Sequence, residues 1–117
     1  MFKKEHRLAK TKDVKAAFEQ GRGFFNPYFS VRHNAKTGQQ RRFTVVVSTK
    51  VSKNATRRNR LKRLVREFAR INMANFLPGD YILALKPKAN QLPDPEVVVV
   101  LSKLLIQAKV YENKRIV

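Results

Sequence analysis

Cysteine is absent from the 117 residues, and glycine occurs only four times. Without cysteine the chain forms no disulfide and has no thiol nucleophile, so we expect a reducing, cytoplasmic environment. The glycines form no loop of the kind that surrounds bound phosphates. No apolar run approaches the roughly 20 residues that cross a bilayer, and residues 1–10 lack the apolar segment of a secretion signal. We therefore expect neither secretion nor a membrane partner.

Acidic residues are also scarce, with eight against 26 lysines and arginines. They are scattered, and no pair has a spacing that suggests general acid–base catalysis. His6 and His33 have no companion ligands nearby in the sequence, so we expect no metal site in the protein. A protein-only nuclease stays open only if carboxylates distant in sequence converge around a metal ion. The sequence thus favours a chain without catalytic residues of its own.

The positive charge is correspondingly large, with a formal net charge of +18. Charge of this size exceeds what solubility requires, and its self-repulsion destabilises the compact state. We expect an anionic partner, and nucleic acid is favoured over the alternative of an anionic membrane surface. Because 43% of the residues are hydrophobic, we expect residues 1–117 to fold as one domain.

The cations concentrate between Arg57 and Arg70, where seven lysines and arginines accompany one acid, Glu67. We expect no group within the protein to offset the repulsion between these cations. Arg57 and Arg58, in a first helical turn, also oppose the helix dipole. An ordinary solvated helix face, the alternative, normally mixes both signs of charge. A phosphate-bearing polyanion would resolve both conflicts. At about 100° per residue, one helix face contains Leu61, Leu64, Val65, Phe68, Ile71 and Phe76, and the opposite face contains Lys62, Arg63, Arg66 and Arg70.

Strand signals occur in three segments. Residues 24–32 are rich in aromatic and β-branched side chains, and Pro27 within them indicates an edge strand or a bulge. Residues 34–40 are polar and predict a hairpin loop. The three consecutive valines within residues 43–49 predict a strand that is buried on both faces. A further strand is expected at residues 81–85.

A first helix is predicted through Gln20 with Thr11 as its cap, a second at residues 55–75 with Asn54 or Ser52 as the cap, and a third near the C-terminus. Residues 97–101 favour a strand by propensity alone. However, Asp94 as a cap, Pro95 at the first helical position and Glu96 in the first turn are typical of a helix start, so we expect a helix. We expect an α+β fold with the order α-β-β-(β)-α-β-α around one mostly antiparallel sheet.

The central segment contains a spaced set of mostly polar and charged residues: Ser48, Lys50, Asn54, Ala55, Arg58, Asn59, Arg60, Lys62, Arg63, Arg66 and Glu67. This spacing resembles the signature of the bacterial ribonuclease P protein subunit, including its Arg-Asn-Arg motif. This resemblance implies an α/β sandwich with a left-handed βαβ crossover. The resemblance further implies an RNA-binding subunit that assists a catalytic RNA in removing the 5′ leader of precursor tRNA. It also implies that the RNA performs the Mg²⁺-dependent hydrolysis, that the chain alone is inactive, and that no further protein partner is obligatory.

Two surfaces follow from the resemblance. Contacts with the catalytic RNA are expected from Lys50, Lys53, Asn54, Arg58, Asn59, Arg60, Lys62, Arg63 and Arg66. Contacts with the single-stranded leader are expected from Val14, Phe18, Arg32 and Lys86.

Three positions depart from the family pattern. Val14 stands where phenylalanine is common, Arg32 where an aromatic residue is common, and Lys53 where glycine is frequent. Arg32 retains a planar guanidinium that can stack on a base, whereas Val14 has no such group. Phe18 has an alternative role as a core residue. A basic ribosomal or DNA-binding protein is the alternative for the whole chain, because it would share the charge.

Overall fold

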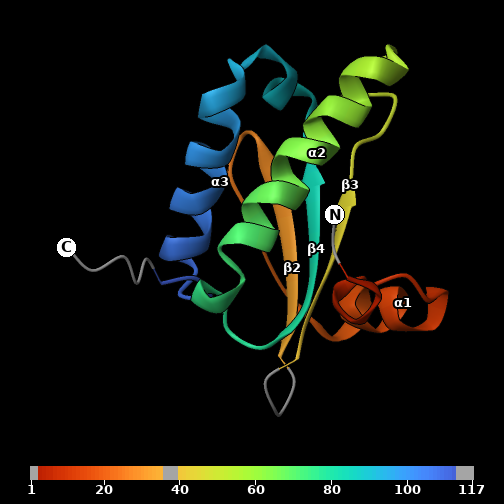
Figure 1. The fold of residues 1–117 in the computed structure, drawn as a ribbon, viewed down its shortest axis with the longest axis vertical. Coiled ribbons are helices and arrows are strands. Elements are labelled where there is room, and N and C mark those ends of the chain that lie inside the picture. The colour runs from red at the N-terminus through yellow and green to blue at the C-terminus, as the bar shows by residue number, and fades with distance from the viewer. Residues whose placement is uncertain (1–2, 36–39, 113–117) are drawn as a thin grey trace.

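The computed structural model describes residues 3–35 and 40–112, which form three α-helices and four strands (Figure 1). The predicted order of helices and strands is confirmed. The helices are α1 (Thr11–Gln20), α2 (Ala55–Ile71) and α3 (Asp94–Gln107), and the strands are β1 (Arg22–Phe25), β2 (Phe29–Ala35), β3 (Arg41–Val46) and β4 (Gly79–Leu85). Short 3-10 turns lie at η1 (Lys4–His6), η2 (Met73–Asn75) and η3 (Pro87–Gln91).

The four strands form one mixed sheet in the order β1-β2-β4-β3. The β1–β2 and β2–β4 pairs are antiparallel, whereas β3 and β4 are parallel and are connected through α2. In Figure 1 both parallel strands point upward, α2 lies in front of them, and the chain moves from β3 on the right to β4 on the left. This connection is the left-handed crossover that the resemblance implied, whereas almost all βαβ connections are right-handed.

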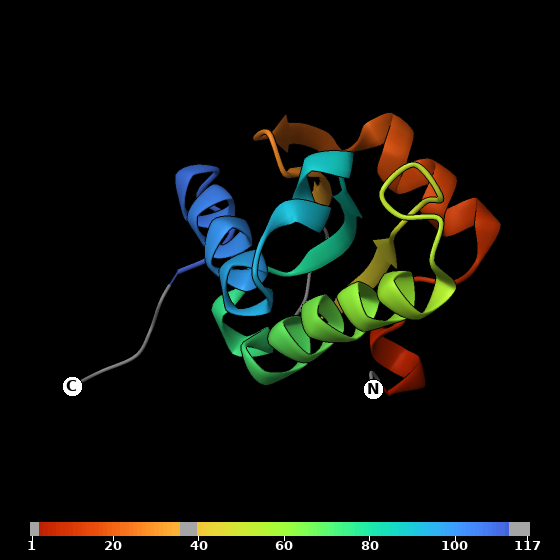
Figure 2. The same ribbon diagram turned by 90° about the horizontal axis from the view of Figure 1, so that it is seen from above.

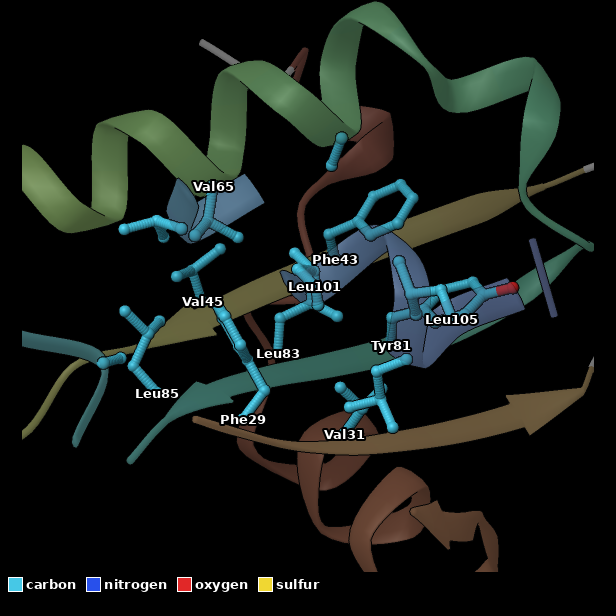
Figure 3. Packing of buried hydrophobic residues seen from close by; sticks show 14 of the residues in the cluster. Phe29, Val31, Phe43, Val45, Val65, Tyr81, Leu83, Leu85, Leu101 and Leu105 are labelled. Carbon is cyan, nitrogen blue, oxygen red and sulfur yellow. The ribbon is translucent and has the colours of Figure 1, made fainter. Parts of the chain in front are cut away.

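The helices cover both faces of the sheet. Figure 2 shows α2 and α3 on one side and α1 on the other. The main core lies beneath α2 and α3, where alternate strand residues such as Phe43, Tyr81 and Leu83 meet Val65 and Leu101 (Figure 3). A smaller cluster beneath α1 contains Leu8, Ala17 and Ile82, with Val14 packed against it. Because side chains alternate along a strand, β4 supplies both layers, with Tyr81 and Leu83 in the main core and Ile82 beneath α1.

The first strand segment was predicted incorrectly as one continuous strand over residues 24–32. A tight turn at Pro27 divides it into β1 and β2, which pair with each other. The carboxamide Oδ1 of Asn26 accepts hydrogen bonds from the backbone N–H of Tyr28 at 2.8 Å and of Phe29 at 2.7 Å. Asparagine favours such turns because its short side chain reaches the backbone two and three residues ahead. Pro27 thus marks a turn rather than a bulge, and the expected edge position holds only for β1, which lies at the edge of the sheet.

The predicted hairpin over residues 34–40 was also wrong, although residues 36–39 lie outside the described part. β2 and β3, on either side of it, are not neighbours, because β4 lies between them. The valine run does not form a strand buried on both faces either. Val45 and Val47 are buried, whereas 43% of Val46 is exposed on the opposite face. The strand that contains them ends at Val46 rather than at residue 49.

The helix starts were predicted more accurately, but Thr11 was wrongly expected to cap α1, because it is the first helical residue and Lys10 stands at the cap position. The Asn54 cap is confirmed, since its side chain accepts hydrogen bonds from the second and third helical N–H groups. α2 ends at Ile71, earlier than the expected residue 75, and η2 follows. The helix expected from Pro95 and Glu96 is also confirmed, although it begins at Asp94 itself, with Pro93 at the cap position. No helix in the described part is long and apolar enough to cross a membrane.

Candidate nucleic-acid interface

The candidate RNA-docking surface begins where the loop after β3 enters α2. Oδ1 of Asn54 accepts hydrogen bonds from the N–H groups of Thr56 at 2.9 Å and Arg57 at 3.2 Å. Ser52 supports the cap, because its hydroxyl oxygen accepts a hydrogen bond from the Asn54 N–H at 3.1 Å. Asn54 therefore satisfies two N–H groups at the helix start that would otherwise be free to bind an anion.

Two arginines of α2 have an acidic partner that lies far away in the sequence. The Asp94 carboxylate, at the start of α3, accepts a hydrogen bond from Nη1 of Arg57 at 2.9 Å and another from Nε of Arg60. The side chain of Asn90 also accepts a hydrogen bond from Arg57, at 2.9 Å. Hydrogen bonds from Arg57 and Arg60 lower the pKa of Asp94. The expectation that no protein group would offset the charge of this helix was therefore wrong at these two positions.

Among the described residues, the other cations of the surface have no acidic partner from a distant part of the sequence. Arg58 donates a hydrogen bond to the backbone oxygen of Ser52 at 2.9 Å, and Arg70 pairs with Glu67 at 2.9 Å, which holds the pKa of Glu67 at about 2. Five cationic side chains of this surface make no hydrogen bond or ion pair with any other group in the described part of the chain. These are Lys50, Lys53, Lys62, Arg63 and Arg66. They form an exposed or half-buried cationic surface along α2 and the loop before it.

The apolar side of α2 corresponds largely to the predicted stripe. Leu61 and Val65 are buried in the main core, and Leu64 and Phe68 pack against it. Ile71 departs from the prediction, since 67% of it is exposed where the helix ends. Phe76 lies beyond the helix but is buried in the same core.

The predicted leader residues lie on the opposite face of the sheet. Phe18 on α1 is 56% exposed, so its alternative role as a core residue is wrong. The guanidinium carbon of Arg32 on β2 lies 4.7 Å from the centre of the Phe18 ring. Val14 is half-buried against the small cluster beneath α1. Lys86, which follows β4, is separate from this group and lies 4.8 Å from the ring centre of Phe25.

A hollow of about 350 Å³ lies between the two predicted surfaces. Val14, from the leader group, and Arg66, from the docking helix, both line it. Arg7, Thr44 and the end of β3 contribute further lining atoms. The structure thus brings residues from the two predicted sites to one depression at the outer edge of the sheet.

The two histidine rings both lie within hydrogen-bond distance of backbone oxygens. Nδ1 of His6 lies 2.9 Å from the backbone oxygen of Arg41. His33 is 7% exposed, stacks on Tyr81 with ring centres 4.4 Å apart, and has Nε2 at 3.1 Å from the backbone oxygen of Pro78. Burial lowers the pKa of His33, which favours its neutral form. Residues 3–35 and 40–112 contain no group of three or more acidic, histidine or cysteine side chains that could hold a metal ion.

Sequence reasoning missed three residues of these surfaces. Asp94 was assigned only to a helix cap, yet it orients two arginines of the docking helix. Phe25 and Val46 are exposed apolar residues on the side of the sheet that faces α1, at 72% and 43% exposure. An unbroken apolar run suggested burial for Val46, and the misplaced first strand concealed the orientation of Phe25. An outward-facing aromatic residue next to the Asn-Pro turn could have been found by assigning that turn correctly.

The fold and its surfaces define a class of small, basic α+β proteins in which a cationic helix lies in a left-handed crossover. A family model described as Ribonuclease P matches residues 2–109. The chain belongs to the bacterial ribonuclease P protein family. It is therefore a component of ribonuclease P, an endoribonuclease that matures the 5′ end of tRNA, and this membership implies association with the ribonuclease P RNA.

Individual relatives agree with this assignment. The ribonuclease P protein component of Exiguobacterium sp. (strain ATCC BAA-1283 / AT1b) is 37% identical over 114 residues, covering 97% of this chain and 98% of the relative. That of Xylella fastidiosa (strain Temecula1) is 33% identical and covers 89% and 76%. Among solved structures, the Staphylococcus aureus RNase P protein superposes with a TM-score of 0.86 at 26% identity, covering 93% and 100%. The Thermotoga maritima protein gives 0.71 at 30% identity, covering 84% and 94%.

Proposed function

We propose that this chain docks on the catalytic RNA of ribonuclease P through α2 and holds the 5′ leader of precursor tRNA on the opposite face of the sheet. The RNA component performs the cleavage with Mg²⁺ that it binds itself. The protein contributes affinity for the RNA and for the substrate, acts as a single domain in the cytoplasm, and needs neither a membrane nor another protein partner.

The observation that supports docking is the row of unpaired cations along α2. Lys62, Arg63 and Arg66 face solvent or a shallow hollow without an acidic partner among the described residues. Bringing three like charges together on one helix face is unfavourable unless an anion is present. RNA phosphates are such anions, and their binding releases counterions, which makes the affinity depend on salt.

Salt-dependent binding tests this surface. Replacing Arg58, Arg60 or Lys62 with alanine should weaken binding to the cognate RNA. For each phosphate that a variant no longer neutralises, the slope of log K against log salt should fall by about 0.7 to 0.9. Because Asp94 already offsets part of the charge of Arg60, we expect a smaller change for Arg60 than for Lys62. Lys103, an exposed cation on α3, is the matched control.

Asn59 is expected to act differently from its charged neighbours. It is exposed and neutral, so it contributes hydrogen bonds and geometry rather than counterion release. Asn59→Ala should lower affinity for the RNA with little change in the salt slope. Unchanged slopes in all the charge variants, or an equal change in the Lys103 control, would remove the docking assignment and favour a basic protein that binds nucleic acid without this geometry.

The leader surface is tested with precursor and mature tRNA. Stacking on an aromatic side chain contributes about 1 to 3 kcal/mol per base. Phe18→Ala should therefore weaken precursor binding by the reconstituted enzyme about 5-fold to 100-fold and leave mature tRNA binding nearly unchanged. Since Phe18 is more than half exposed, the variant should keep its unfolding midpoint in urea. Equal losses for both tRNAs, or no loss for either, would contradict a leader contact.

Cleavage assays test whether the RNA or the protein hydrolyses precursor tRNA. The described residues contain no cluster of acids or histidines suited to a metal ion, which favours hydrolysis by the RNA. Protein free of RNA and of contaminating nuclease should leave precursor tRNA intact in millimolar Mg²⁺. The RNA alone at high Mg²⁺, and both components at low Mg²⁺, should cut it. Cleavage by the protein alone would refute this assignment.

A further inference from the structure

The face of the sheet that is proposed to hold the leader is only partly covered by α1, and one half of it is open. In strand register, Phe25 on β1 lies opposite Ser30 on β2, Ser30 lies opposite Ala84 on β4, and Ala84 pairs with Val46 on β3. Phe25, Ser30 and Val46 in this row are exposed. The preceding row contains Arg32 and the buried Ile82, which packs beneath α1. The cover provided by α1 therefore ends between the two rows.

Phe25 is the dominant side chain of this open half. It is 72% exposed, more than any other large hydrophobic residue in the described part. Lys86 places its ammonium group 4.8 Å from the centre of the Phe25 ring. The same ammonium donates a hydrogen bond to the backbone oxygen of Asn26 at 3.1 Å, which fixes it beside the ring. The pair is therefore anchored to the turn between β1 and β2.

This pair repeats an arrangement already present on the same face. Phe18 lies 4.7 Å from the guanidinium of Arg32, so both sites combine an exposed ring with a cation above it. Arg32 is opposite Gly23, and Phe25 is two residues further along β1 on the same face. Two residues along a strand correspond to about 7 Å. The two pairs are thus consecutive positions along one open surface.

We propose that Phe25 and Lys86 form a second base-stacking site for the single-stranded leader, in line with Phe18 and Arg32. The ring offers its free face to one base, and Lys86 lies close enough to pair with the phosphate of the same nucleotide. Aromatic rings above a cationic groove are the features that hold single strands regardless of sequence. Since Val14 carries no ring on α1, Phe25 supplies a stacking surface from the sheet instead. This inference rests on the proposed leader function of the same face.

The test uses the reconstituted enzyme and precursor tRNAs whose leaders are shortened one nucleotide at a time. Phe25→Ala should weaken binding of a long-leader precursor about 5-fold to 100-fold, the range for removing one base stack. Mature tRNA binding should not change. Phe25→Trp should retain affinity, and Phe25→Leu, apolar but without a ring, should not. The effects of Phe25→Ala and Phe18→Ala should disappear at different leader lengths.

The role of Lys86 is tested through the salt dependence of precursor binding. Lys86→Met keeps the aliphatic stem and removes the charge, so it should reduce the salt slope of precursor binding by about 0.7, as expected for one phosphate of a single strand. Lys88→Met, whose ammonium lies 5.6 Å from the ring of Tyr28, is the matched control and should leave the slope unchanged.

The possible outcomes separate this inference from the proposed function. A loss with Phe18→Ala but none with Phe25→Ala overturns the second site alone, whereas no loss with either also overturns the leader surface. If Phe25→Ala weakens precursor and mature tRNA equally, Phe25 contacts another part of the complex and the inference fails. If both effects disappear at the same leader length, the two rings do not hold successive nucleotides.

Discussion

Arg42 on β3 connects the sheet to α1, and its replacement provides a demanding test of the structure. Its Nε and Nη2 atoms donate hydrogen bonds to the Asp80 carboxylate on β4 at 2.8 and 2.7 Å. Its Nη1 atom donates to Asp13 on α1 at 3.1 Å. The Asp80 side chain is 3% exposed, whereas that of Asp13 is 30% exposed. The hydrogen bond with Asp80 is the main cause of the raised pKa of Arg42.

Because the two acidic partners of Arg42 differ in burial, the loss of each ion pair should cost a different free energy of unfolding. Arg42→Met leaves the Asp80 carboxylate buried without a counter-charge, and breaking a buried pair in this way costs about 3 to 5 kcal/mol. Asp13→Asn removes a partly exposed pair, for which about 0.2 to 1 kcal/mol is typical. For a domain of ordinary stability, about 5 to 15 kcal/mol, the first change approaches unfolding and the second barely alters stability.

Urea unfolding followed by circular dichroism at neutral pH measures the difference. Arg42→Lys should give an intermediate loss, because lysine keeps the charge without the two-pronged geometry. The double variant Arg42→Met with Asp80→Leu should recover most of the stability, since it no longer leaves an unpaired buried charge. Equal losses for Arg42→Met and Asp13→Asn, or no recovery in the double variant, would refute the reasoning.

Three further changes test other parts of the structure. The free energy of unfolding should fall as the pH drops below about 6.5, the ordinary pKa of histidine, because His33 takes up a proton more readily in the unfolded chain than in the folded protein. The urea midpoint of His33→Gln should depend less on pH. Lys109 has a φ of 62°, a backbone conformation that costs non-glycine residues about 1 to 2 kcal/mol. Lys109→Gly should therefore raise the free energy of unfolding, measured by thermal unfolding, by about 0.5 to 1 kcal/mol, because the greater backbone freedom of glycine in the unfolded chain cancels part of the gain. Asn54→Ala should cost about 0.5 to 2 kcal/mol, whereas Asn54→Asp should keep the cap but weaken RNA binding by repulsion; equal RNA affinity for Asn54→Asp and the native chain would argue against a phosphate near the cap.

Local sequence signals determined the helix starts and the family. α1 ended at Gln20 and α2 began directly after Asn54 as expected, whereas α1 began at Thr11, which had been expected to be its cap. The choice of a helix over a strand after Asp94 was also correct. These features depend on residues within one helical turn of each other, so their physical causes are present in the sequence itself. The spacing of the Arg-Asn-Arg motif similarly identified the family before any tertiary information was considered.

Tertiary structure decided the features that depend on residues far apart in the chain. Asp94 pairs with Arg57 and Arg60, more than thirty positions away, so only the packing of α3 against α2 shows which cations remain unpaired. β4 lies between β2 and β3, although it follows both in the sequence, because α2 crosses over before the sheet is completed. The exposure of Phe18 and Phe25 depends on where α1 stops covering the sheet. Apolar periodicity indicates that a residue can be buried, but only the arrangement of the neighbouring elements decides whether it is.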